Sequence, residues 1–323
     1  MSEDFLDILF VVIWRFFMAS ILLSLQGAVS QGVLWGIMVL GVYITYKILN
    51  ISDLTVDGSF ALGSCICATM IVNYEMNPFL ALVVAMLAGV LAGAVTGILH
   101  TVFEIPAILA GILTQISLWS INLRIMGGKS NMPLLKVDTI FTGLVEKTGM
   151  KQSMISLIFG IVIAAIVISV LYWFFGTEIG SAIRATGNNE KMIRALGVDI
   201  KKTKMIGLML ANGLVGLSGA LVCQNSKYGD INMGTGAIVI GLAAIVIGEV
   251  LMGKIVSFKA KLTSAVVGSV VYFMIRAIVL QLGMSANDMK LLSAVIVALA
   301  LCVPVAMEKY RIKHSYNPEG GDE

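Results

Sequence analysis

The feature that most constrains this chain is a series of long apolar stretches separated by short polar breaks. A helix needs roughly 20 apolar residues to cross the hydrocarbon core of a bilayer. The ten-residue alternation of apolar and polar positions that marks membrane β-barrels does not occur in the sequence. We therefore predict an all-α, polytopic membrane protein, with about nine or ten transmembrane helices at 5–24, 28–48, 58–73, 79–100, 105–125, 153–176, 203–224, 236–252, 262–282 and 289–307.

Composition supports a membrane location. Of the 323 residues, 58% are hydrophobic and 13% are charged, whereas soluble domains carry roughly 25% charged residues. The start of the chain is acidic and lacks the basic residues of a cleaved signal peptide, so we expect 5–24 to be a retained helix that spans the membrane or lies at its surface. We divide the chain into a hydrophobic N-terminal extension (1–25), a transmembrane domain (26–307) and a tail (308–323).

Basic residues predict which loops face the cytoplasm, because cytoplasmic loops are enriched in Lys and Arg. Three segments stand out: 177–204 with six basic residues, 253–261 with three lysines and no acid, and the tail with three more basic residues. We predict that these segments and the C-terminus are cytoplasmic. The longer loop 126–152 has mixed charge and is then predicted to lie outside.

Motifs for catalysis, metal binding and nucleotide binding are missing from the sequence. Gly128-Lys129-Ser130 imitates the end of a phosphate-binding loop, but Leu123 occupies the position of its first glycine. Cys65 and Cys67 have no histidine nearby in sequence and are interpreted as small residues that face helices or lipid. We predict no catalytic residue, no metal site and no cofactor in this chain, and no nucleic-acid partner. Intramembrane carboxylates, which ion-coupled carriers usually need, are scarce.

A polar interruption at 50–60 is the first functional candidate. Irregular backbone at membrane depth is tolerated where protein or a water-filled cavity surrounds it, and transporters often place helix breaks at their substrate sites. Asp57 is also predicted to cap the helix that follows. The alternative is a solvated loop, or a break that Asp53 and Asp57 merely fix. Our candidate substrate path consists of polar residues of this segment and of a mid-chain helix: Asp53, Thr55, Asp57, Ser59, Gln115 and Asn122.

The basic segment 177–202 is the second candidate. We predict a short amphipathic helix here, from about Ser181 to Leu196, with apolar residues between the charges. Such a helix either docks in a groove of a partner protein or lies on the anionic inner leaflet of the membrane. The residues alone leave both possibilities open.

Three motifs resemble the permeases of branched-chain amino acid and ribose type ABC transporters, over about residues 26–307. Thr177-x-x-Gly180, followed by Arg184-Ala185-x-Gly187-x-Asn189 and Ala195-Leu196-Gly197-Val198, resembles their cytoplasmic coupling loop. The run from Gly236 to Glu249 resembles the signature helix of the family. The run from Asp53 to Phe60 resembles the subfamily of tryptophan/tyrosine-type permeases.

This resemblance implies the permease of a type II importer-like ABC system in the bacterial plasma membrane, surrounded by lipid and working as a homodimer. Each subunit would dock one cytoplasmic ABC ATPase, which binds ATP and Mg, and an extracytoplasmic binding protein would deliver a small solute such as an amino acid. If so, Asp53 is expected to meet the ammonium group of that solute. The residues expected to contact the ATPase are Arg184, Ala185, Gly187, Asn189, Glu190, Arg194, Ala195 and Gly197.

Two other functions remain to be compared with this one. An ion-coupled secondary transporter or channel would act without an ATPase, and a membrane scaffold would have no substrate path. Neither gives the segment 177–198 a purpose, so both are disfavoured.

Overall fold

The computed structural model describes residues 24–135, 137–253, 257–285, 288, 291, 293–299, 302 and 309. The predicted helix 5–24, most of the predicted helix 289–307 and most of the tail lie outside the described residues. Within them, seven helices are long and apolar enough to span a membrane. The prediction of a helical, polytopic membrane protein is therefore confirmed.

The first described helix, Ser24–Ile48, ends in a π-helical turn, η1 (Ile44–Ile48). The other spanning helices are α2 (Thr55–Val72), α3 (Pro78–Thr101), α4 (Ala107–Ile125), α6 (Gln152–Phe174), α9 (Ile200–Ser226) and α11 (Phe258–Gln281). Four shorter helices are α5 (Ile140–Thr148), α7 (Glu178–Asn188), α8 (Glu190–Ala195) and α10 (Ala237–Met252). Two short strands, β1 (Asn131–Pro133) and β2 (Tyr228–Asp230), form an antiparallel pair.

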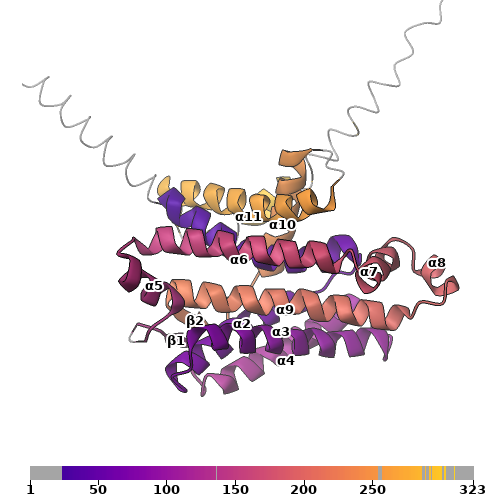
Figure 1. The fold of residues 1–323 in the computed structure, drawn as a ribbon, viewed down its shortest axis with the longest axis horizontal. Coiled ribbons are helices and arrows are strands. Elements are labelled where there is room, and N and C mark those ends of the chain that lie inside the picture. The colour runs from indigo at the N-terminus through magenta and orange to yellow at the C-terminus, as the bar shows by residue number, and fades with distance from the viewer. Residues whose placement is uncertain are drawn as a thin grey trace, which may run out of the picture.

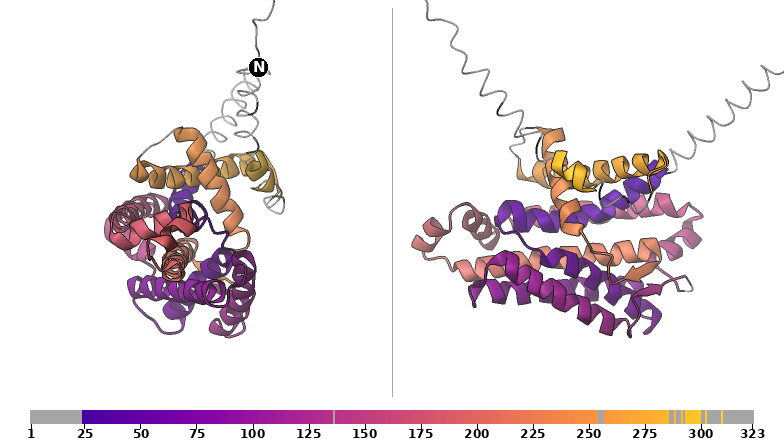
Figure 2. Two further views of the ribbon diagram at one scale, coloured as in Figure 1. Left: turned by 90° about the vertical axis from the view of Figure 1, so that its right-hand side faces the viewer. Right: turned by 180° about the vertical axis from the view of Figure 1, so that it is seen from behind.

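The long helices run side by side, with β1, β2 and α5 at one end of the bundle and α7 and α8 at the other (Figure 1). We call these the strand end and the α7–α8 end. The first helix, α2 and α9 are mostly buried and form the core, whereas α4 and α6 are mostly exposed. The shorter α10 crosses the bundle steeply instead of running along it (Figure 2).

Glycines allow the core helices to pack with their backbones in contact. Gly89, Gly93 and Gly97 of α3 all face α9, and Gly63 of α2 lies against the backbone of Gly216 in α9. A side chain at Gly63, Gly89 or Gly93 would overlap a neighbouring carbonyl. In lipid, where apolar burial provides no net drive between helices, such close contacts are a main source of association. Gly89, Gly93 and Gly97 thus form one packing face of α3.

Candidate functional site

The chain between the first helix and α2 turns back into the bundle. Residues 49–54 are not helical, and Asn50 has a positive φ of 54°. Asp53 is 1% exposed and bonds to Asn212, near the middle of α9. The polar segment is thus irregular backbone that exposes Asn50 and Ser52 but buries Asp53, and α2 begins at a fully buried Thr55.

A network of buried polar side chains holds Asp53. One carboxylate oxygen accepts from the backbone N–H of Thr55 at 2.9 Å, and the other accepts from the side-chain amide of Asn212 at 2.7 Å. The amide oxygen of Asn212 accepts from Ser59 at 2.7 Å, and the hydroxyls of Thr55 and Thr96 lie 2.7 Å apart. Asp53, Thr55 and Ser59 are therefore bonded to the protein itself and stabilise the start of α2.

Asp57 caps a different helix from the one predicted. Its two carboxylate oxygens accept from the backbone N–H groups of Gly236 and Ile238, both at 2.9 Å, so it caps the N-terminus of α10. The residue before α2, Leu54, provides no side-chain cap. The prediction that Asp57 caps its own helix was wrong because Asp57 already lies in the first turn of α2, where its side chain reaches a neighbouring segment.

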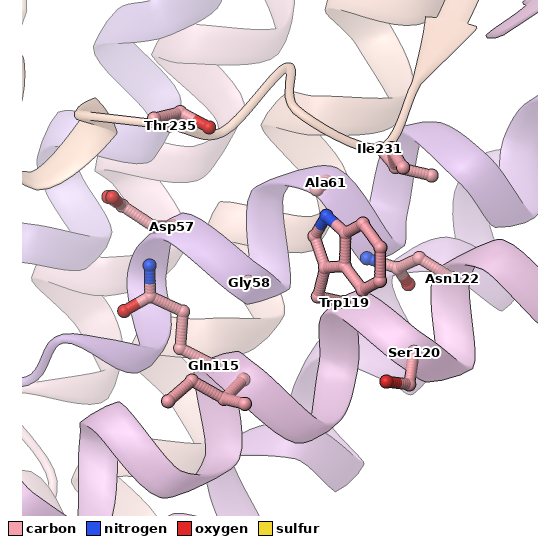
Figure 3. A pocket seen from close by; sticks show the side chains of 10 residues that line it. Asp57, Gly58, Ala61, Gln115, Trp119, Ser120, Asn122, Ile231 and Thr235 are labelled. Carbon is pink, nitrogen blue, oxygen red and sulfur yellow. The ribbon is translucent and has the colours of Figure 1, made fainter. Parts of the chain in front are cut away.

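A cavity of about 240 Å³ lies between α2, α4 and the segment that joins β2 to α10 (Figure 3). Three residues of the predicted substrate path meet here, namely Asp57, Gln115 and Asn122. The other three, in the Asp53 network, do not line it. The complete lining is Asp57, Gly58, Ala61, Gln115, Ile116, Trp119, Ser120, Asn122, Ile231 and Thr235.

Trp119 is the main lining residue that the sequence analysis missed. Gln115, Trp119 and Asn122 stand at positions i, i+4 and i+7 of α4, which is the spacing of one helical face. That spacing was readable from the sequence once two of the three were candidates. Thr235 had no comparable signal, because its place at the cavity depends on the capping of α10 by Asp57.

At the α7–α8 end of the bundle, α7 and α8 form a two-helix element. The single helix predicted from Ser181 to Leu196 is divided at Asn189, whose side-chain oxygen accepts from the backbone N–H of Met192 at 3.1 Å and so caps α8. Glu190 in α8 forms an ion pair of 2.6 Å with Lys204 of α9.

The α7 helix is firmly seated on the spanning helices. Ile183 is fully buried, and Gly187 lies so close to the carbonyl of Ile48 that any side chain there would overlap it. The hydroxyl of Thr186 lies 3.0 Å from that of Thr203 in α9. The element is therefore held against both the first helix and α9.

The outward face of this element exposes apolar residues among charges. Met192 is 51% and Leu196 is 71% exposed, and Arg194 between them is exposed. Arg184 is exposed as well, with its guanidinium 4.7 Å from the ring centre of Phe258. Of the predicted ATPase contacts, the exposed ones are Arg184, Asn189, Glu190, Arg194, Ala195 and Gly197, whereas Ala185 and Gly187 are half-buried.

The family model for the permease component of branched-chain amino acid transport systems matches residues 24–303. The chain belongs to this permease family. It is the transmembrane permease subunit of an ABC importer, a multi-pass membrane protein without catalytic activity of its own, and the family predicted from its motifs is confirmed.

The relatives of this chain include two named permeases. The tyrosine transport system permease protein of Clostridioides difficile (strain R20291) is 40% identical over 268 residues, which cover 83% of this chain and 87% of that protein. An uncharacterized protein of Rickettsia prowazekii (strain Madrid E) is 32% identical and covers 85% and 95%. The ribose import permease of Escherichia coli (strain K12) is 24% identical and covers 78% and 76%. No solved structure matches the permease.

The Asp53 network gives a test of whether Asp53 acts on substrate or on structure. Asp53→Ala removes the acceptor of one buried amide donor and one backbone N–H, and each unsatisfied buried group costs about 1–3 kcal/mol. We expect the purified permease to melt at a clearly lower temperature, whereas Asp138→Ala, which removes an exposed carboxylate, leaves melting unchanged. Unchanged melting with lost uptake would instead place Asp53 on the substrate path.

Proposed function

We propose that this permease imports an aromatic amino acid across the bacterial plasma membrane, as a homodimer that docks one ABC ATPase on the α7–α8 element of each subunit. A binding protein outside the cell delivers the solute at the strand end. The amino-acid class is supported by the 40% identical relative, which is named as a tyrosine transport permease. The direction and the partners follow from the family.

The proposed ATPase contact is supported by two features of the α7–α8 element. The element is fixed to the spanning helices, and it exposes apolar side chains. Met192 and Leu196 project from α8 and its C-terminus, while the ion pair of Glu190 with Lys204 fixes α8 to the start of α9. To transmit movement of the ATPase, α7 and α8 must stay fixed relative to the spanning helices that they contact. Apolar side chains ringed by charge are also the usual anchors of a docked helix.

The orientation follows from charge. The α7–α8 end carries Lys191, Arg194, Lys201 and Lys202 in exposed positions. Basic residues gather on the cytoplasmic side of membrane proteins, so we place this end in the cytoplasm. The same rule applied to Lys309, Arg311 and Lys313 of the tail places the C-terminus there as well.

The route from ATPase to solute runs through the first helix. Gly187 of α7 touches the carbonyl of Ile48, and residues 49–54 lead directly from there to the buried start of α2. We propose that movement of α7 shifts this irregular segment and thereby the cavity beside Asp57.

Negative charge introduced at Arg194 of α8 and at Leu196, its C-cap, tests the ATPase contact. We expect Arg194→Glu and Leu196→Asp each to reduce the ATPase that co-purifies with the permease at least tenfold, because each places a carboxylate in the docking surface. Lys147→Glu, an exposed reversal in α5 at the strand end, is the matched control and should retain full binding. The measurement is stoichiometry and ATP hydrolysis of the complex expressed with its neighbouring genes.

Two results would contradict the proposal. One is full ATPase binding and coupled hydrolysis in both Arg194→Glu and Leu196→Asp. The other is transport in liposomes that contain the permease alone, if an ionophore abolishes that transport. This result would favour an ion-coupled carrier.

A further inference from the structure

The cavity between α2, α4 and the β2–α10 segment contains an asparagine without hydrogen-bond partners. Asn122 is 0% exposed, and neither its amide nitrogen nor its amide oxygen has a partner among the described residues. A buried polar group is normally bonded, because leaving it unpaired forfeits its bonds to water. The Asn122 amide therefore has donors and an acceptor available for hydrogen bonds to a bound molecule.

A second buried asparagine of the same bundle, Asn212, has a structural role and is fully hydrogen-bonded by the protein. Asn212 is equally buried, yet its amide bonds to Asp53, Ser59 and the carbonyl of Leu208. The bundle thus satisfies an asparagine where the fold depends on it. The contrast with Asn122, which lines a cavity, points to a ligand.

We propose that this cavity is a solute subsite that binds an amine-bearing molecule of amino-acid size, with Asn122 as the principal hydrogen-bonding residue. The inference rests on the proposed import function and deepens it, since it assigns a place and a chemical class to the solute. The amide offers two donors and one acceptor, so it pairs at once with an ammonium group and with an acceptor such as a carboxylate.

The charge of the lining favours an amine. Asp57 is the one ionisable residue among the described residues that line the cavity, which include no Lys, Arg or His. Each of its oxygens accepts one backbone N–H, and a carboxylate has about four acceptor positions in all. It therefore retains capacity for the N–H groups of a solute and disfavours a solute whose only charge is negative.

The remaining wall fits a planar or apolar side group. Trp119 lies on the same face of α4 as Asn122 and Gln115, beside the cavity (Figure 3). Indole faces attract both flat rings and cations. The volume of about 240 Å³ is below the roughly 300–1,000 Å³ of sites for drug-sized ligands, which suits a single amino acid or a small amine.

The test is direct binding to the purified full-length permease in nanodiscs, monitored by tryptophan fluorescence. The probes are L-tyrosine, tyramine (which keeps the amine and lacks the carboxylate) and 3-(4-hydroxyphenyl)propionate (which keeps the carboxylate and lacks the amine). We expect saturable changes with L-tyrosine and tyramine only. The signal should disappear in Trp119→Phe.

The decisive variant is Asn122→Leu, which is close in size and removes the unpaired amide. We expect at least a tenfold weaker affinity for L-tyrosine together with an unchanged or higher melting temperature, because an unsatisfied group has been removed. Ser117→Ala is the matched control on the same helix, since the Ser117 hydroxyl donates to the carbonyl of Leu113 in its own helix and Ser117 does not line the cavity. Asn122→Asp should favour tyramine over L-tyrosine relative to the native protein.

Several results would overturn the subsite. With the native protein, the contradicting results are the absence of a saturable signal with either amine, or equal binding of the propionate. In Asn122→Leu they are native affinity or a lowered melting temperature. In Asn122→Asp it is an unaltered ratio of tyramine affinity to L-tyrosine affinity. Failure here is distinguishable from failure of the proposed function. A permease that binds no probe but still co-purifies with its ATPase and transports in the complex loses only the subsite.

Discussion

Replacement of Gly63 by leucine is expected to prevent the permease from forming a stable bundle. Gly63 of α2 lies directly against the backbone of Gly216 in α9, and a side chain can fit only if the two core helices separate. Overpacking costs about 1–3 kcal/mol where neighbouring side chains can adjust, and backbone cannot adjust in that way. We expect the cost at Gly63 to exceed that range and the yield of monodisperse protein to collapse, as measured by size-exclusion chromatography and thermal unfolding.

A second glycine provides the control for this result. Gly143 lies inside the short helix α5, and a Cβ atom there would meet nothing within 4 Å. Gly143→Ala should therefore leave the melting temperature unchanged or raise it slightly, because alanine restricts the unfolded chain. A Gly63→Leu protein that melts like the native one would show that α2 and α9 are not packed through their glycines.

Loss of the Asp57 carboxylate is expected to reduce uptake to background. Asp57→Ala leaves the backbone N–H groups of Gly236 and Ile238 without their acceptor. Both N–H groups are half-buried at the start of α10, beside the cavity, so the cost of about 1–3 kcal/mol for each unsatisfied buried group is an upper bound here. Asp57→Asn keeps one acceptor oxygen and should show intermediate uptake. Radiolabelled L-tyrosine uptake in cells with the intact transport system provides the measurement.

Asp230→Ala is the comparison for Asp57→Ala. Asp230 is half-buried and accepts from the backbone N–H of Asn232 at 2.7 Å and from the side chain of Asn131 at 3.2 Å. Both bonds are exposed, so water can replace the lost oxygens. We expect near-native uptake in this variant. Native uptake in Asp57→Ala, at equal protein level in the membrane, would contradict the role assigned to the α10 cap.

The helices could be predicted because each carries its own signal. The apolar run predicted at 79–100 corresponds to α3 at Pro78–Thr101, and that at 203–224 corresponds to α9 at Ile200–Ser226. The loop predicted at 126–152 contains β1 and α5, which were missed. The register of β1 pairs Asn131 with Asp230, and a three-residue strand whose partner is a hundred positions away leaves no local pattern. The short α5 gives too little periodicity to read.

The candidate site could be predicted only in part, because polar residues are visible in the sequence whereas their partners are not. The sequence identified Asp57 and Asn122 as polar residues in apolar surroundings, and the structure brings them to one cavity. It did not reveal that Asp53 would be satisfied by Asn212, because that contact depends on the depth at which α2 starts. Polarity is a local property of the sequence, whereas satisfaction of a polar group depends on the partners that the fold supplies.

The cap that Asp57 places on α10 has a consequence for how the permease is made. The two partners, Asp57 and Gly236, are 179 residues apart in the chain. At a synthesis rate of roughly 5–20 residues per second, α10 follows α2 out of the ribosome by on the order of 10–40 s. Throughout that interval the carboxylate of Asp57 has no N–H groups of α10 to bind. The wall of the cavity that the segment between β2 and α10 helps to form is therefore completed only after most of the chain has been synthesised.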